Sequence, residues 1–109
     1  MSNRGKPLRE VTKLLVWGRA AGRCQFKNCQ KALDHDLVAG KPEFNAAYLA
    51  HIVASSPNGK RGHPTRSHQL SDDASNIMLM CDAHHRVIDG EQTWKSYPED
   101  LLLQWKREH

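Results

Sequence analysis

The chain has 109 residues, of which 39% are hydrophobic and 26% are charged, a composition typical of one compact soluble domain. It carries 16 Lys and Arg against 12 Asp and Glu, and the resulting net charge of +4 favours polyanions such as nucleic acid only mildly. Its apolar runs are too short to cross a bilayer, and its basic start lacks the apolar core of a signal peptide. We therefore expect a cytoplasmic protein without a membrane segment.

The N-terminal part of the chain predicts one helix followed by loops. We expect residues 1–7 to be a flexible N-terminus and residues 8–109 to form a single domain. Apolar residues then recur at helical spacing, which predicts a helix with these residues facing the core, and Gly22 supplies its stop signal. These apolar residues are Leu8, Val11, Leu14, Leu15, Trp17 and Ala21. The polar, turn-rich segment 33–44 predicts a loop.

The middle of the chain predicts two strands and a helix. Residues 45–54 have the β-branched and aromatic content of a short strand. Residues 55–73 are rich in Pro, Gly, Ser and basic side chains and predict a long loop, which in a small domain usually has a function. A second apolar strand is expected over 76–80. The segment 81–89 then fits a helix closed by Gly90.

The last predicted helix covers residues 97–109. Pro98 lies in its first turn, acidic residues stand beside it, and basic residues occupy its far end, which suits the helix dipole. No cap or glycine stops this helix at His109. We therefore expect the chain to be an N-terminal domain excised from a longer polypeptide.

Two pairs of potential metal ligands lie far apart in the sequence. Cys24 and Cys29 form one pair, and Cys81 and His84 form the other. Folding can unite two such pairs into a tetrahedral Cys3His site, whose sulfur and imidazole donors suit a structural Zn2+ ion. The odd number of cysteines argues against a disulfide framework. In the alternative interpretation the cysteines are merely small buried hydrophobic residues.

A second histidine follows the first one directly. Neighbouring residues on a helix point about 100° apart, so His84 and His85 are not expected to bind the same ion. Asp89, four residues further on, shares a helix face with His85. Together they can hold a harder cation, or the acid can orient the imidazole.

At this point the sequence resembles the HNH endonucleases, whose ββα-metal fold carries a His, an Asn and a His in that order. "AHI" and "SNIMLMC" match around His51 and Asn76, and "HH" supplies His85. The two pairs of zinc ligands match the zinc knuckle that flanks the motif in many members. The resemblance implies an α+β fold with a ββα-metal (HNH, or His-Me finger) core, a zinc knuckle and flanking N- and C-terminal helices.

More narrowly, three segments are similar to the N-terminal nuclease domain of HNH–SAVED effectors from bacterial anti-phage signalling systems (CBASS). These segments are "AHIVASSPNGKRG", "CDAHHRVID" and "YPEDLLLQWKREH". The similarity implies degradation of double-stranded DNA, switched on by assembly when a C-terminal sensor binds a cyclic oligonucleotide. No sensor-type sequence occurs among the 109 residues. The apolar helix faces would allow a homodimer.

The resemblance also implies roles for individual residues. His51 would act as the general base that takes a proton from water, and Asn76 would hold His51 or its strand in register. His85 and a carboxylate would hold one Mg2+ or similar divalent cation at the scissile phosphate. Products would carry 5′-phosphate and 3′-hydroxyl ends.

The chain departs from one common pattern of the family. Many members have an aspartate immediately before the first histidine, whereas this chain has Ala50. We expect Asp89 to supply the missing carboxylate, with Asp73 as the second choice and a turn-capping role as the alternative for Asp73. Asp72 is expected to be solvated.

Three basic residues of the predicted loop are expected to contact DNA phosphates. They are Lys60, Arg61 and Arg66. Such contacts give affinity that falls with salt and little sequence preference. Two other functions remain open, namely a stand-alone restriction or homing nuclease and a non-catalytic zinc-knuckle module that binds nucleic acid or protein.

Overall fold

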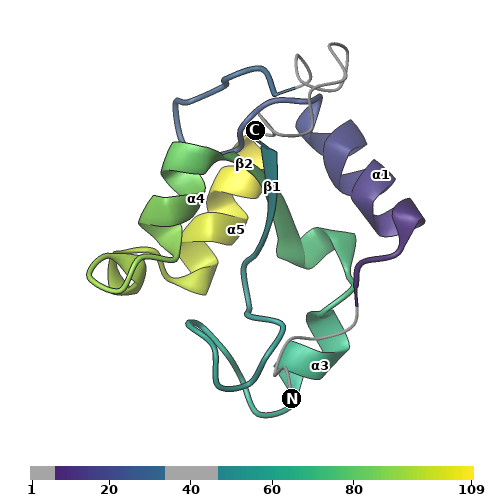
Figure 1. The fold of residues 1–109 in the computed structure, drawn as a ribbon. Helices are drawn as coiled ribbons and strands as arrows, with labels where there is room; N and C mark the ends of the chain where they lie inside the picture. The colour runs from purple at the N-terminus through teal and green to yellow at the C-terminus, as the bar shows by residue number, and fades with distance from the viewer. Residues whose placement is uncertain (1–6, 34–46) are drawn as a thin grey trace.

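The computed structural model describes residues 7–33 and 47–109 and has the expected α+β class (Figure 1). Residues 1–6 of the predicted N-terminal segment, residues 34–44 of the predicted loop and residues 45–46 of the first predicted strand lie outside the described residues. Within the described part, no helix has both the length and the apolar character needed to span a membrane. The elements are α1 (Glu10–Ala20), β1 (Ala47–His51), α3 (Arg66–Leu70), η2 (Ala74–Asn76), β2 (Ile77–Cys81), α4 (Asp82–Ile88), η3 (Trp94–Ser96) and α5 (Glu99–Glu108).

Strands β1 and β2 form an antiparallel two-stranded sheet, and α4 follows β2 directly. The register pairs Ala47 with Cys81 and His51 with Ile77. Both predicted strands are confirmed, but β1 ends at His51 rather than continuing to residue 54. It ends there because the buried amide of Asn76, and not a partner strand, takes both backbone groups of Val53.

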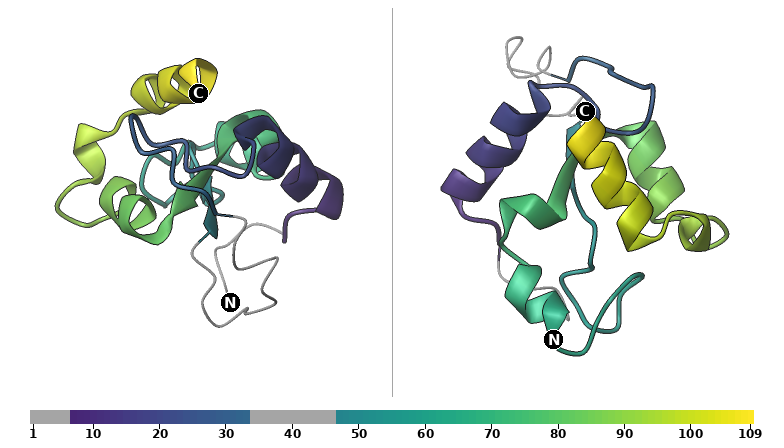
Figure 2. Two further views of the ribbon diagram at one scale, coloured as in Figure 1. Left: turned by 90° about the horizontal axis from the view of Figure 1, so that it is seen from above. Right: turned by 180° about the vertical axis from the view of Figure 1, so that it is seen from behind.

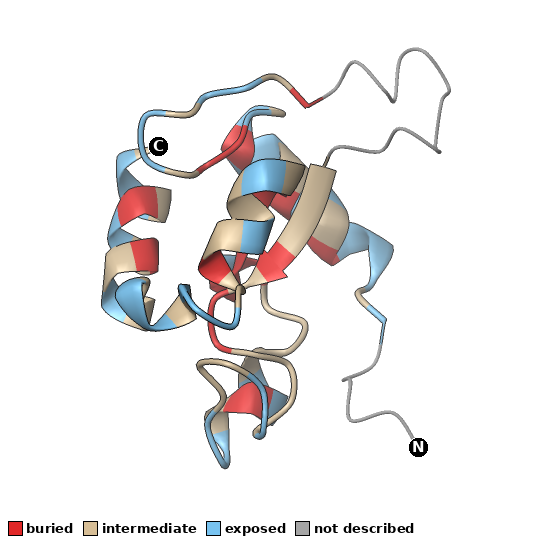
Figure 3. Cartoon of the chain, turned by 60° about the vertical axis from the view of Figure 1, so that its left-hand side comes forward, coloured by how far each residue is buried: buried red, intermediate tan, exposed pale blue. Residues whose placement is uncertain are grey.

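All five residues of β2 are buried, because helices cover the sheet (Figure 3). A lone two-stranded sheet is marginal in water, so this cover is what makes the strands stable. Helix α1 packs against β2 and η2, while α4 packs against both strands. Seen from behind, α1 and α5 lie on either side of the segment that carries η2 and β2 (Figure 2).

The predicted orientation of α1 is confirmed only in part, because Leu8 and Trp17 pack against the core while other expected residues do not. Its buried residues are Thr12, Val16 and Ala20, whereas three of the residues expected in the core are exposed by 43% or more. Those three are Val11, Leu14 and Leu15. The small side chains spaced by four residues let the helix approach β2 closely, which favours this face over the bulkier one. The helix does stop near Gly22, where Ala21 (φ 54°) and Gly22 (φ 69°) adopt left-handed backbone conformations.

The predicted loop 55–73 is also not wholly irregular, since it contains the short helix α3. The ring of His63 helps to start this helix, because its Nδ1 atom accepts hydrogen bonds from the backbone N–H groups of Thr65 and Arg66. Asp72, which was expected to be solvated, instead pairs with Arg9 in front of α1. These contacts tie the segment to the rest of the domain.

The helices predicted over 81–89 and 97–109 are confirmed with shorter bounds. Cys81 serves as the N-cap of α4, so its side chain stands at the end of β2 and at the start of the helix. Pro98 is the N-cap of α5 rather than part of its first turn, and Glu99 and Asp100 follow it. The order strand, strand, helix therefore brings the residues after β1 close to α4.

Candidate metal centre and active-site cleft

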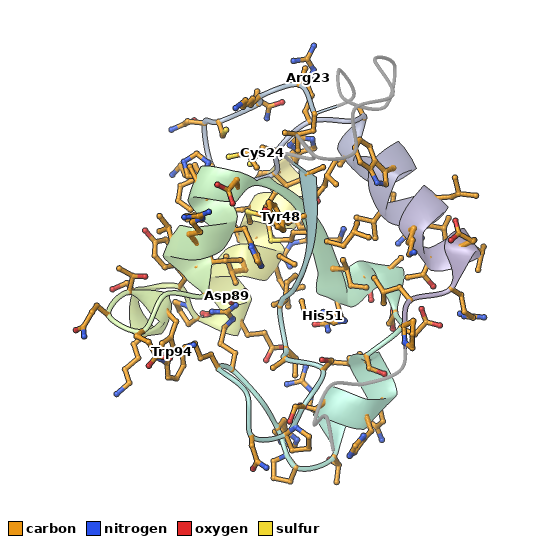
Figure 4. All side chains as sticks on the ribbon, viewed as in Figure 1. Arg23, Cys24, Tyr48, His51, Asp89 and Trp94 are labelled. Carbon is orange, nitrogen blue, oxygen red and sulfur yellow. The ribbon has the colours of Figure 1, made fainter. Side chains whose placement is uncertain are left out.

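The structure brings together the two predicted pairs of metal ligands. One ligand atom from each of Cys24, Cys29, Cys81 and His84 lies within 4.8 Å of all the others. His84 Nδ1 lies 3.3 Å from Cys81 Sγ and 3.7 Å from Cys24 Sγ. Figure 4 shows Cys24 close to one end of α4. Three sulfurs and one imidazole nitrogen can hold one metal ion and are compatible with a zinc site.

A tight turn presents the first pair of cysteines. Cys24 N–H donates to the Lys31 carbonyl (2.9 Å), and Cys29 N–H donates to the Phe26 carbonyl (3.0 Å). The buried residue Gln25 fastens this turn to β2, because its N–H donates to the Leu79 carbonyl while its Oε1 accepts from Leu79 N–H. The turn thus forms hydrogen bonds with the backbone of Leu79 in β2. Its two cysteine sulfurs lie near the start of α4.

The environment of the cluster favours a bound cation. Cys24 and Cys81 are 0% and 4% exposed. Burial raises the pKa of the Cys24 thiol to about 12, because desolvation penalises the thiolate and the neighbouring Cys81 adds repulsion. A divalent cation would supply the opposite charge that buried thiolates need. Two of the four donors are buried and two are half-buried, which is compatible with a structural site that has four protein ligands.

Aromatic packing fixes the histidine of this cluster. The His84 ring stacks on Phe26 with 4.0 Å between ring centroids and 7° between planes. Phe26 in turn meets Trp105 of α5 edge-on at 4.7 Å. The cluster therefore links the cysteine turn, β2, α4 and α5.

A second site is a cleft of about 280 Å³ between β1, the segment after it and α4. Four residues predicted for catalysis or binding line it together, although they come from separate parts of the sequence. The full lining is Leu49, Ala50, His51, Ala54, Ser55, Lys60, His85 and Asp89. His84 is not among them. The adjacent imidazoles therefore serve different sites, as the helix geometry predicts.

The hydrogen bond of His51 defines which of its nitrogens is free. His51 Nε2 lies 2.8 Å from the Ser71 carbonyl oxygen. A carbonyl can only accept, so Nε2 carries the hydrogen and Nδ1 of the neutral ring keeps its lone pair. No described residue forms a hydrogen bond with Nδ1. This nitrogen can therefore accept a proton from a molecule in the cleft.

The Asn76 side chain holds two backbone segments near His51, the one that follows β1 and the end of α3. Its side chain accepts from Val53 N–H (2.8 Å) and donates to the carbonyls of Val53 (2.9 Å) and Leu70 (3.1 Å). Val53 follows His51, and Leu70 precedes the Ser71 carbonyl that the His51 ring contacts. The 4% exposure of Asn76 means that water cannot replace these bonds.

His85 and Asp89 form the other half of the cleft. His85 Nε2 lies 3.3 Å from Asp89 Oδ2, and the His85 ring stacks on Tyr48 at 4.7 Å. Burial by itself would raise the pKa of Asp89, but hydrogen bonds from His85 and Arg61 hold it below its usual value. The carboxylate is therefore charged at neutral pH and stands beside an imidazole nitrogen.

The other acidic candidate, Asp73, has a different place. Its Oδ1 accepts from the N–H (2.9 Å) and hydroxyl (2.7 Å) of Ser75, so it caps η2. Asp73 does not line the cleft. Of the two acids considered for the carboxylate missing at Ala50, the structure brings only Asp89 to His85.

Arg61 does not face solvent, contrary to its predicted contact with DNA. Its side chain is 5% exposed, and its guanidinium bonds to the carbonyls of Ile52 (2.8 Å) and Ile88 (2.7 Å) and to Asp89 Oδ1 (2.6 Å). All of these partners belong to the protein. Arg61 therefore joins the segment after β1 to the end of α4 and orients the carboxylate, and its burial keeps the guanidinium away from a phosphate in solution.

The two other predicted phosphate contacts differ from each other. Lys60 lines the same cleft as His51 and Asp89, and its ammonium pairs with Glu91 at 2.9 Å. Arg66 makes a two-pronged ion pair with Glu99, at 2.9 and 2.5 Å, and does not line the cleft. Lys60 is thus the one of the three that remains well placed for a phosphate in the cleft.

The sequence interpretation missed three residues that shape the sites. Tyr48 supports His85, Phe26 supports His84, and Gln25 fastens the cysteine turn to β2. Phe26 and Gln25 lie between the two cysteines, and this position was a usable signal. Nothing local marked Tyr48, because its partner is 37 residues away in a chain of 109.

No model of a known protein family matches the chain, and no curated protein sequence matches it.

Proposed function

We propose that the protein is a metal-dependent endonuclease of the HNH type that hydrolyses phosphodiester bonds of double-stranded DNA. The observation that carries this proposal is the single cleft that contains His51, with its free Nδ1, and the His85–Asp89 pair. The sequence resemblance to HNH endonucleases gives the same residues the same roles. The chain would act in the cytoplasm, where DNA is accessible.

His51 is the general base in this mechanism. Water in the cleft gives a proton to Nδ1 as its oxygen attacks phosphorus, the bond from phosphorus to the 3′ oxygen breaks, and the leaving oxygen takes a proton from solvent. The Ser71 carbonyl accepts from Nε2–H, so it holds the ring in the reactive tautomer and stabilises the positive charge that forms. Asn76 is a positioning residue, because it fixes the backbone on which both groups depend.

Asp89 and His85 would hold the catalytic Mg2+ or a similar divalent cation. His85 Nε2 and Asp89 Oδ2 lie 3.3 Å apart, and a cation would replace the hydrogen that now joins them, with the other tautomer of His85 supplying the lone pair. When bound, this cation supplies charge neutralisation at the scissile phosphate and at the leaving oxygen. Lys60 adds a nearby positive charge that favours substrate binding at low salt.

The narrower proposal is that the chain is the nuclease domain of a cyclic-oligonucleotide-activated anti-phage effector. The three segments similar to HNH–SAVED effectors support it. In such a protein the oligonucleotide binds a C-terminal domain and causes several chains to assemble. This assembly, of which a homodimer is the smallest form, activates the nuclease. The two-strand cleavage of DNA then needs two copies of the cleft.

A plasmid assay tests the proposal. Supercoiled DNA is incubated with Mg2+ or Mn2+ and the protein fused to a dimeric coiled coil, so that assembly is not limiting. We expect nicking and linearisation, which His51→Ala slows by about 100-fold or more because it removes the base. The matched control is His68→Ala. This histidine is exposed on α3, and the variant should cleave at the normal rate. Equal rates for His51→Ala and the unaltered protein, at equal zinc content, would overturn the mechanism.

A non-catalytic zinc-knuckle module is the second candidate function. The Cys3His cluster favours it, since that cluster is complete without the cleft. A module of this kind would bind DNA or protein, would show no cleavage in the fused dimer, and would be indifferent to His51→Ala. The plasmid assay combined with a binding assay separates the two functions.

A further inference from the structure

A second cavity of about 280 Å³ lies among α1, η2 and α5 and has no role in the mechanism above. It shares no lining residue with the cleft. Its lining consists of Arg19, Gln25, Ser75, Leu103, Lys106 and Arg107. Figure 2, seen from behind, shows the elements that supply most of these residues, with α1 on one side and α5 on the other.

Three positive charges meet at this cavity without an acidic partner. Arg19, Lys106 and Arg107 make no ion pair within residues 7–33 and 47–109, and no acidic residue lines the cavity. Elsewhere in the described residues, six basic side chains do pair with acids, namely Arg9, Lys13, Lys60, Arg61, Arg66 and Arg86. Asp73 is close enough to interact with Arg19, but its hydrogen bonds go to Ser75. The cavity therefore gathers three cations without an ion pair among the described residues, and the Asp73 carboxylate beyond Ser75 is a nearby negative charge that interacts with Arg19.

Lys106 is the most constrained of the three cations. Its Nζ donates to the Ile77 carbonyl at 2.8 Å, and this single contact leaves two N–H groups for another acceptor. Burial lowers the pKa of Lys106 to about 8, and repulsion from Arg19 adds to the effect. A half-buried ammonium that is repelled by its neighbour destabilises the folded chain, unless an anion joins it.

We propose that this cavity binds a phosphate group. The exposed guanidinium groups of Arg19 and Arg107 can each bind tetrahedral phosphate oxygens with paired N–H donors, and Lys106 adds an ammonium to the same lining. Leu103 offers an apolar wall for the organic part of a phosphate ester. The phosphate can come from a nucleic-acid backbone or from a free phosphoester such as a nucleotide. The site does not depend on the proposed nuclease activity, because none of its residues belongs to the cleft.

The test is a titration of the zinc-loaded protein with inorganic phosphate, monitored by ¹H–¹⁵N NMR. No Mg2+ is added, and the ionic strength is kept constant. We expect saturable shifts of the amides of Ser75, Leu103 and Lys106. The variant Arg19→Gln/Arg107→Gln should weaken binding by at least about tenfold. Its matched control, Lys31→Gln/Lys95→Gln, removes two exposed charges outside the cavity and should change affinity by less than about twofold.

Two further arms identify the source of the phosphate. Saturation at lower concentrations of a nucleoside 5′-monophosphate than of inorganic phosphate would support a free phosphoester. Shifts of the same amides by a short DNA duplex, lost in Arg19→Gln/Arg107→Gln, would support a backbone phosphate. The duplex arm uses the His51→Ala protein, so loss of cleavage cannot be confused with loss of this site.

Three results would overturn the proposal. The first is a linear response to phosphate without saturation. The second is an equal loss of affinity in the control variant, which would reduce the effect to net charge. The third is an equal response to acetate at the same concentration, which would show an unselective anion site. Failure here would leave the nuclease proposal intact, and the plasmid assay tests that proposal separately.

Discussion

The Cys3His cluster and the cleft make opposite uses of the same short helix. Helix α4 contributes His84 to the cluster and His85 to the cleft, and each ring stacks on one aromatic side chain. In the cluster, His84 Nδ1 faces sulfurs that are nearly or fully buried. In the cleft, His85 and Asp89 keep 31% and 36% of their side-chain surface exposed.

The difference shows how surroundings decide the role of one residue type. Four protein ligands that converge in a buried place leave no position for another molecule, so a metal there stabilises the fold. An imidazole beside a carboxylate at an open cleft still has nitrogen and oxygen atoms that are accessible to solvent, so the pair can bind a ligand from solution. Sequence neighbours can therefore have separate functions, one in folding and one in reactivity.

The largest expected effect comes from removing a ligand of the cluster. His84→Ala should abolish stoichiometric zinc and the cooperative thermal transition. The physical reason is that metal-binding energy in such small sites, on the order of 10–16 kcal/mol, is comparable to the whole stability of a domain. Zinc content by atomic spectroscopy and circular dichroism during heating check this. A variant that melts like the unaltered protein would contradict the structural role of the cluster.

The neighbouring substitution should have the reverse profile. His85→Ala should keep the zinc and the thermal transition but lower plasmid cleavage by about 100-fold or more, because the proposed cation site loses its nitrogen donor. The check is cleavage rate against Mg2+ concentration, with zinc content measured on the same sample. If His85→Ala lost zinc together with His84→Ala, the two sites could not be separate.

An intermediate effect is expected at Asn76, which supports the cleft from the core. Asn76→Ala leaves the N–H and carbonyl of Val53 unpaired in a buried place, so the free energy of unfolding should fall by about 2–3 kcal/mol. Urea denaturation measures this loss, and cleavage should also slow as His51 loses its support. Gln69→Ala, at an exposed residue of α3, is the control. A loss below about 0.5 kcal/mol would show that the amide does not hold the segment.

The smallest expected effect is a pH dependence at Asp89. Its pKa in the folded chain lies below the ordinary value of 3.8, so its stabilising contribution is present above that pH. The contribution disappears as the pH falls through the lowered pKa, because the protonated acid no longer pairs with Arg61 and His85. The difference in unfolding free energy between Asp89→Asn and the unaltered protein should therefore shrink below pH 3.8. Asp100→Asn, at an exposed residue, is the control, and a difference independent of pH would contradict the assignment.

Much of the candidate site was predictable because its information is local. Ligand spacing predicted the union of Cys24, Cys29, Cys81 and His84, and helix geometry predicted that His85 points elsewhere and shares a face with Asp89. The two strands and the helix after them were predictable from apolar runs and turn signals. Each ligand pair, strand and helix face is a pattern of a few neighbouring residues, and only the meeting of the two ligand pairs spans distant parts of the chain.

Other features depended on contacts between distant segments. The sequence could not show that α1 buries Thr12, Val16 and Ala20 instead of its larger apolar residues, because the shape of β2 and η2 selects the face. It also could not assign Arg61, whose partners lie nine to 28 residues away in sequence.

The amino-acid sequence by itself determined which donors were available and which neighbours must diverge, since spacing along a helix or strand sets direction. Only the tertiary structure decided that His51 turns its Nε2 to Ser71, that Asp89 rather than Asp73 meets His85, and that three cations share a cavity without an acid. These outcomes depend on contacts between distant segments, which decide which side chains are buried and which partners they bind. No pattern of neighbouring residues contains that information.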